Sequence, residues 1–88
     1  MPAYEVLFTL SAIKNLGRLD SVQQQRIRAK LTQYAKSGNP LMFARQLSGV
    51  KPPTYRYRIG KYRVIFDVKG TSLRILNVSL RDKAYTDL

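Results

Sequence analysis

The chain has 88 residues, a length that suits one domain, so we expect residues 1–88 to form a single domain. It contains neither cysteine nor histidine, which excludes disulfides and thiolate metal sites and removes the commonest general base of enzymes. Sixteen Lys and Arg residues against five Asp and Glu residues give a formal net charge of +11. This charge predicts an anionic partner, which is nucleic acid, an anionic membrane surface or an acidic protein. No apolar run approaches a membrane span and the N-terminus lacks a signal-peptide pattern, so we expect a cytoplasmic protein with no membrane partner.

The first two elements expected in the chain are a short strand and a short helix. Residues 4–8 read as the strand. Ser11 is expected to cap a helix that has Ile13 and Leu16 on its apolar side and stops near Gly17.

A second helix is predicted after Asp20, a good N-cap residue with Gln23 three positions further on. Its apolar stripe comprises Ile27, Leu31, Tyr34 and Ala35. The run Ser-Gly-Asn-Pro over residues 37–40 should end this helix. Residues 41–53 are expected to form a connection, with one helical turn near residues 43–47.

Three strands are predicted in the second half of the chain, over residues 54–59, 62–68 and 72–79. The last two are joined by a three-residue loop at residues 69–71. The predicted order is β-α-α-β-β-β, in which consecutive strands with short turns form a mostly antiparallel sheet. We therefore expect an α+β fold, with the N-terminal strand and a two-helix hairpin packed on that sheet.

The first two of these strands have the pattern of a β-hairpin. Two alternating runs are separated by two residues, one of them Gly, and such a loop pairs Ile59 with Tyr62. Arg58 then lies opposite Arg63. Directly opposed like charges destabilise a sheet, so we expect this pair to bind an anion, and the hairpin is a candidate phosphate site.

Alternation collects arginines on the sheet face that turns away from the helices: Arg56, Arg58, Arg63 and Arg81. The three-residue loop would set Asn77 beside Arg63 on that face. Three tyrosines have the opposite parity and are expected in the core rather than as base-stacking platforms: Tyr55, Tyr57 and Tyr62. Ten of the sixteen basic residues lie in residues 45–88, which read mainly as strands, whereas a basic membrane helix would place the charge elsewhere.

Three segments carry a resemblance to a known family: Leu47-Ser-Gly49, Tyr55-Arg-x-Arg-Ile-Gly-x-Tyr-Arg-Val-Ile-Phe66 and Val78-x-x-Arg-x-x-x-Tyr85. In this order and spacing the chain resembles the RelE/ParE toxin superfamily of bacterial type II toxin–antitoxin systems, over nearly its whole length. The resemblance implies a RelE-like fold. RelE-like members are endoribonucleases that cut mRNA in the ribosomal A site, whereas ParE-like members poison DNA gyrase.

The RelE-like branch uses basic residues on two neighbouring strands, an arginine at the end of the last strand and a tyrosine near the C-terminus. Carried over by motif, the resemblance implies five catalytic residues here: Arg56, Arg58, Arg63, Arg81 and Tyr85. Further candidates for RNA contacts are Lys61, Asn77 and Lys83. Many relatives carry histidine just before the last arginine, where this chain has Leu80, so a mechanism here must rest on arginine and tyrosine.

The implied activity is that of a metal-independent endoribonuclease without a cofactor. The 2′-OH of RNA is an internal nucleophile, so cleavage requires neither a metal nor a covalent enzyme residue. Guanidinium groups suit the phosphorane transition state because their forks match phosphate oxygens. Tyr85 is the candidate base on the condition that nearby guanidinium groups favour its phenolate form. The assignment of the base and acid roles stays open.

The resemblance also implies two partners, which are a cognate antitoxin protein and mRNA on the ribosome. The chain would then be an mRNA interferase that inhibits translation. The alternatives are a ParE-like inhibitor of DNA gyrase and a non-catalytic nucleic-acid-binding relative. The Arg-x-Arg pair together with Arg81 and Tyr85 favours the nuclease.

Overall fold

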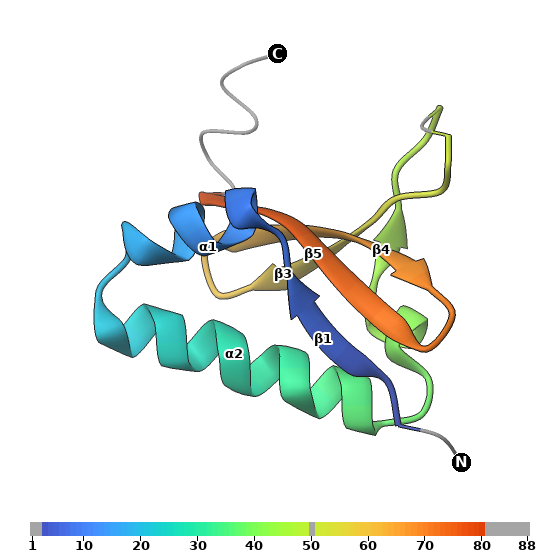
Figure 1. The fold of residues 1–88 in the computed structure, drawn as a ribbon, viewed down its shortest axis with the longest axis horizontal. Coiled ribbons are helices and arrows are strands. Elements are labelled where there is room, and N and C mark those ends of the chain that lie inside the picture. The colour runs from blue at the N-terminus through green and yellow to red at the C-terminus, as the bar shows by residue number, and fades with distance from the viewer. Residues whose placement is uncertain (1–2, 50, 81–88) are drawn as a thin grey trace.

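The computed structural model describes residues 3–49 and 51–80, which form a five-stranded mixed sheet with two α-helices packed on one face (Figure 1). The strands lie in the order β1-β5-β4-β3-β2; β1 is parallel to β5 and the other neighbours are antiparallel. The elements are β1 (Glu5–Phe8), α1 (Leu10–Gly17), α2 (Ser21–Lys36), a 3₁₀ helix η1 (Pro40–Phe43), β2 (Arg45–Gln46), β3 (Tyr55–Ile59), β4 (Tyr62–Lys69) and β5 (Ser72–Leu80). The predicted α+β fold is confirmed, with β2 as an additional short strand.

The core lies between the helices and one face of the sheet. Period-2 alternation along β3 and β4 turns every second side chain toward α1 and α2, which run in opposite directions beside the strands (Figure 1). The buried apolar residues are Ala12, Leu16, Ile27, Leu31, Ala35, Tyr57, Ile59, Tyr62, Val64, Phe66, Leu73, Ile75 and Val78. The tyrosines assigned to the core are confirmed there, with Tyr57 and Tyr62 buried and Tyr55 half-buried against the cluster.

The N-cap of α1 is Thr9, so the prediction of Ser11 was wrong. The Thr9 hydroxyl accepts a hydrogen bond from the Ala12 N–H at 3.2 Å and donates one to the Ile75 carbonyl at 2.9 Å. The Thr9 N–H also donates to the Ile75 carbonyl, at 3.1 Å. A contact with β5, remote in sequence, therefore sets the point where α1 begins.

The face of α1 that packs on the sheet is correspondingly rotated relative to the face predicted from the sequence. Ala12 and Leu16 are buried against the sheet, whereas Ile13, which was expected on the apolar side, is 50 % exposed. Helix neighbours at i and i+4 share a face, so a core contact through Ala12 and Leu16 turns Ile13 outward.

Replacing Thr9 with alanine is expected to lower the free energy of unfolding by about 1–2 kcal/mol, because it removes both the N-cap and the bond to Ile75. Urea unfolding of the variant and the parent measures the difference. Ser11→Ala is the matched control and should stay within about 0.5 kcal/mol of the parent. Equal losses in the two variants would contradict the cap assignment.

Helix α2 forms as predicted. The Asp20 carboxylate caps it by accepting a hydrogen bond from the Gln23 N–H at 2.9 Å. Ile27, Leu31 and Ala35 are buried at the i, i+4, i+8 spacing of one helix face. The helix ends at the predicted Ser-Gly-Asn-Pro run, with Ser37 as its C-cap.

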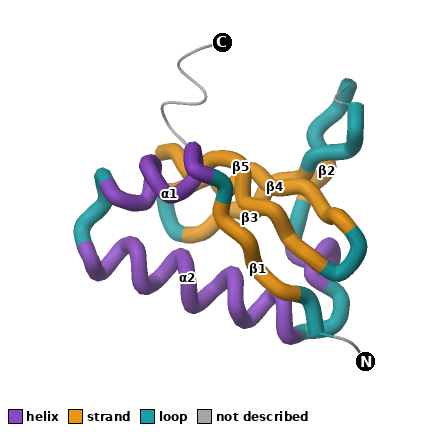
Figure 2. Tube along the Cα trace, viewed as in Figure 1, coloured by secondary structure: helices purple, strands orange, loops and turns teal. Residues whose placement is uncertain are grey.

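The connection before β3 differs from the prediction. Its helical turn lies at Pro40–Phe43 rather than near residues 43–47, and β2 pairs with the start of β3. Proline suits the first position of such a turn because its φ is already restricted. The Pro40 carbonyl accepts a hydrogen bond from the buried Tyr57 hydroxyl at 2.9 Å, which anchors the turn to the core. The loop between β2 and β3 then projects from the sheet edge (Figure 2).

The β3–β4 register is the predicted one. Ile59 pairs with Tyr62, and Arg58 lies opposite Arg63. Gly60, in the two-residue turn, has φ +60°, a conformation that favours glycine.

The β4–β5 register corrects the expected place of Asn77. The loop holds two residues rather than three, since Lys69 pairs with Ser72, and β5 contains a bulge at Leu76. Asn77 therefore lies opposite Ile65, and Ser79 is the residue opposite Arg63. A bulge inserts one residue into a strand, so the alternation of side chains along β5 reverses after Leu76. Val78 consequently faces the core.

Candidate functional site

Four arginines on three neighbouring strands form what we call the arginine surface: Arg45, Arg56, Arg58 and Arg63. Arg45 of β2 lies opposite Arg56 of β3, and Arg58 of β3 lies opposite Arg63 of β4. Residues opposite one another across antiparallel strands have Cβ atoms about 4.5–5.5 Å apart and point to the same face. The structure thus brings together three of the predicted catalytic residues, on the sheet face away from the helices, and adds Arg45.

A shallow cavity opens at the β2 end of this surface. It has a volume of about 160 Å³ and is lined by Phe43, Arg45, Arg56 and Arg58. Arg45 and Arg58 are exposed and Arg56 is half-buried, so their side chains bound a solvent-accessible hollow. Arg63 is half-buried and its Nε is shielded from solvent. An anion in this hollow would meet several guanidinium groups at once.

The described part of the chain contains three carboxylates, one of which, Asp67, lies on the same sheet face as Arg56. Of the acidic residues in the described part of the chain, Asp20 caps α2 and Glu5 lies on β1, at the opposite edge of the sheet from β2. Asp67 is held by Arg74. Four guanidinium groups on one sheet face attract phosphate groups.

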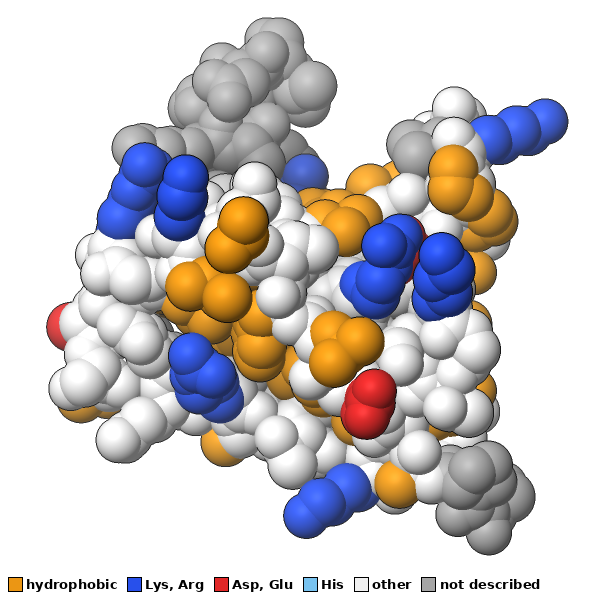
Figure 3. Space-filling model, in the orientation of Figure 1, with side chains coloured by type: hydrophobic (Ala, Val, Ile, Leu, Met, Phe, Trp, Pro, Cys, Tyr) orange, Lys and Arg blue, Asp and Glu red, His pale blue; other side chains and the backbone are white. Residues whose placement is uncertain are grey.

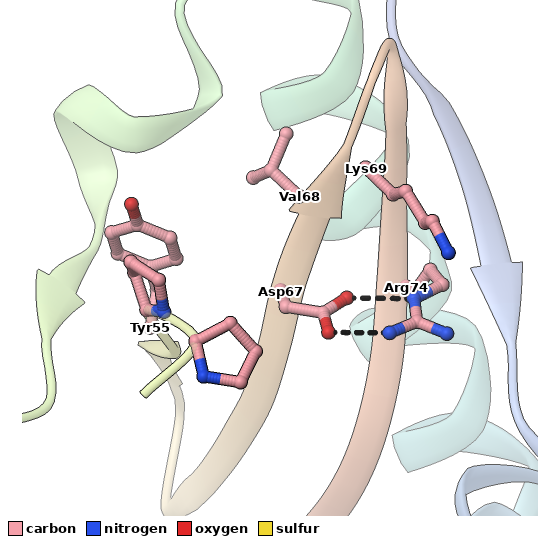
Figure 4. Close-up of a pocket in the computed structure, with 7 residues that line it drawn as sticks. Tyr55, Asp67, Val68, Lys69 and Arg74 are labelled. Atoms are coloured by element: carbon pink, nitrogen blue, oxygen red, sulfur yellow. Dashed lines mark hydrogen bonds and ion pairs between the residues drawn. The ribbon is translucent and has the colours of Figure 1, made fainter. Parts of the chain in front are cut away.

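At the other end of the same sheet face, the positive charge of Arg74 is neutralised by the Asp67 carboxylate. Arg74 donates two hydrogen bonds to the Asp67 carboxylate, from Nε at 2.9 Å and from Nη2 at 2.6 Å (Figure 4). These hydrogen bonds and the charge of Asp67 raise the pKa of Arg74 above its ordinary value. The pair borders a cavity of about 290 Å³ that also contacts Tyr55 and the Pro52-Pro53 segment. Because the charge of Arg74 is matched by Asp67, Arg74 adds little attraction for an anion in this cavity.

The remaining predicted contact residues have separate positions. Lys61 is exposed in the β3–β4 turn, and Asn77 is exposed on β5 opposite Ile65. Three predicted residues lie outside the described residues: Arg81, Lys83 and Tyr85.

Tyr57 is not available as a base. Burial raises its pKa, and its hydroxyl donates to the Pro40 carbonyl, so the phenol stays neutral.

Sequence reasoning missed Arg45 and Phe43 as parts of the site. Both lie in residues 41–53, which read as a connection because a two-residue strand has no detectable alternation. The only signal was composition: an aromatic residue and an arginine two positions apart, just before the hairpin.

Replacing Arg45 with glutamine is expected to raise the free energy of unfolding by a few tenths of a kcal/mol up to about 1, because it relieves like-charge repulsion with Arg56 across the strands. Thermal unfolding at low and high salt measures this. The gain should shrink at high salt, which screens charges. A lower melting temperature at low salt would show that Arg45 has a stabilising partner.

Within residues 3–49 and 51–80, no group of three or more His, Cys, Asp or Glu residues could hold a metal ion. Nor does this part of the chain contain a helix long and apolar enough to cross a membrane.

The fold and the arginine surface define a class of small, strongly basic α+β proteins suited to binding phosphate groups on an exposed sheet face. The family model described as "ParE toxin of type II toxin-antitoxin system, parDE" matches residues 6–85. The chain therefore belongs to this family of type II toxins, within the RelE/ParE superfamily predicted from its sequence. A search of curated protein sequences finds no match.

Solved structures of toxins in complex with their antitoxins are similar to this chain. The archaeal RelE–RelB complex from Pyrococcus horikoshii matches at 26 % identity and a TM-score of 0.72, covering 91 % of this chain and 97 % of the other. The RelBE2 complex from Mycobacterium tuberculosis matches at 28 % identity and a TM-score of 0.69, covering 91 % and 100 %. The E. coli RelBE complex has 22 % identity and a TM-score of 0.71, covering 89 % and 96 %, and supports the fold alone.

Proposed function

We propose that this toxin cleaves mRNA on the ribosome and that the arginine surface holds the scissile phosphate. The observation that carries the proposal is the Arg58–Arg63 pair, which lies across two strands with Arg56 two residues away on the same face. Guanidinium groups that share a sheet face in this way can contact the oxygens of one phosphate group together.

The chemistry follows from the properties of these groups. Guanidinium groups stay protonated and place two N–H donors in a plane, so they stabilise the charge that develops on the phosphorane oxygens. They cannot serve as the base. Arg81 follows the last described residue of β5 directly in sequence, and we assign it a further phosphate contact. We assign the proton transfer from the 2′-OH to Tyr85.

The proposed protein partner is a cognate antitoxin. The similar P. horikoshii and M. tuberculosis structures are toxin–antitoxin complexes, and a net charge of +11 favours an acidic partner. Apolar side chains are also exposed, on the face shown in Figure 3 beside α1, where an antitoxin segment could cover them. The large apolar residues that are exposed on α1, α2 and β1 are Leu7, Leu10, Ile13 and Val22.

Primer extension on a translated mRNA after brief expression tests the activity. Cuts within codons that disappear when translation is blocked are the expected result, because positioning on the ribosome supplies part of the rate. Intact mRNA in cells whose growth is inhibited would overturn the proposal.

Inhibition of DNA gyrase is the second candidate, and the observation that favours it is the ParE description of the matching family. In that case brief expression would give cleaved DNA and intact mRNA. Growth inhibition with neither product would point to a non-catalytic nucleic-acid-binding protein.

A further inference from the structure

The ring of Phe43 ends a column of aromatic side chains that runs out of the core. Phe66 stacks on Tyr57 with centroids 4.3 Å apart and an interplanar angle of 16°. Tyr57 contacts Tyr34 at 4.6 Å, and Tyr34 stacks on Phe43 at 4.6 Å and 17°. Phe43 is 41 % exposed, so Tyr34 covers one side of the ring while part of the ring remains accessible.

The accessible part of Phe43 borders the cavity of the arginine surface. The ring lines the same hollow of about 160 Å³ as the side chains of Arg45, Arg56 and Arg58. An apolar aromatic wall beside guanidinium groups matches a ligand that is flat and apolar at one end and anionic at the other. A nucleotide has this composition, since its base stacks on aromatic rings and its phosphate binds arginine.

The ring is held in place before any ligand arrives. Phe43 is the last residue of η1, whose turn is closed by a hydrogen bond from the Ala44 N–H to the Leu41 carbonyl at 3.1 Å. The first residue of η1, Pro40, is tied to the core by the Tyr57 hydroxyl. Stacking on a ring that is already ordered costs little conformational entropy.

We propose that Phe43 and Arg45 form a single-nucleotide subsite at the edge of the arginine surface. One base of single-stranded RNA stacks on Phe43, and the adjoining phosphate binds Arg45 and Arg56. The inference rests on the proposed function in one respect, which is that RNA binds to the same surface. It adds a specificity for unpaired nucleotides, because a base within a duplex cannot stack on a protein ring.

Fluorescence offers a direct test, because the chain contains no tryptophan. Phe43→Trp places a single indole at the subsite, and its emission should be quenched when a 2′-O-methyl oligoribonucleotide of eight nucleotides binds. The 2′-O-methyl groups prevent cleavage. The matched control is Met42→Trp, since Met42 is 67 % exposed and does not line the cavity. Quenching in both variants, or in neither, would overturn the proposal.

Measurements of oligonucleotide affinity distinguish the contribution of base stacking from the contribution of charge. Phe43→Leu, which keeps apolar contact with Tyr34, should weaken binding of this oligonucleotide by about tenfold with an unchanged salt dependence. Arg45→Gln should also weaken binding and should lower the slope of log K against log salt by about 1. Melting curves show whether each of these variants is folded. If one is not, the quenching of Phe43→Trp emission still tests whether a base stacks at this position.

The outcomes are distinguishable from failure of the proposed nuclease. If oligonucleotide binding depends on Phe43 but the parent does not cleave mRNA, the subsite proposal stands and the nuclease proposal is wrong. If the parent cleaves mRNA and Phe43→Leu binds the oligonucleotide with full affinity, the nuclease proposal stands and the subsite proposal is wrong. If Phe43→Leu weakens binding of a poly-glutamate peptide but not of the oligonucleotide, the hollow accepts an acidic protein segment and the proposal is wrong.

Discussion

Tyr85→Phe is expected to slow ribosome-dependent mRNA cleavage by about 10²–10⁴, the usual contribution of a general acid or base. The substitution keeps the ring and removes only the hydroxyl, so packing should be preserved. Binding to the ribosome should be nearly unchanged because arginines supply most of the electrostatic attraction. Single-turnover cleavage rates on programmed ribosomes measure the effect.

A packing role for Tyr85 gives a different pattern. In that case Tyr85→Phe would cleave at the parent rate, and only Tyr85→Ala would lower the melting temperature. This result would remove Tyr85 from the mechanism and leave a site built of arginines. Tyr57→Phe is a useful comparison, because the Tyr57 hydroxyl is buried and bonded to Pro40 and should affect stability rather than the chemical step.

Arg58→Ala is expected to slow cleavage by about 10²–10³, the range observed when one donor to a developing oxyanion is removed. Arg58 lies opposite Arg63 on an exposed face, where it can contact a phosphate together with its neighbour. Arg58→Lys should recover part of the rate, since lysine restores the charge without the planar pair of donors. Pre-steady-state cleavage assays on the same mRNA give both numbers.

Lys30→Ala is the matched control, because it removes one positive charge from the exposed face of α2, in the helical layer. Its cleavage rate should equal that of the parent at physiological salt. An equal loss in Lys30→Ala and Arg58→Ala would mean that net charge, rather than a local phosphate contact, determines the rate. The same result would favour the gyrase or simple binding alternatives.

Much of the fold could be predicted from local sequence. Asp20 and the buried spacing Ile27, Leu31 and Ala35 determine where α2 begins and which face it buries, because capping and helical periodicity act over a few residues. The Arg58–Arg63 pair was predictable for the same reason. A two-residue loop containing Gly60 fixes the register of the hairpin, and alternation then fixes the face.

Other features depend on contacts between distant segments, and only the tertiary structure decided them. The start of α1 follows from the bonds of Thr9 to Ile75, and the positions of Asn77 and Ser79 follow from a bulge in β5 that no local pattern marks. Arg45 and Phe43 join the site because a two-residue strand pairs with β3 and because η1 is tied to Tyr57. Such short elements have too few residues to carry a periodic signal, and their geometry is determined by the partners on which they pack.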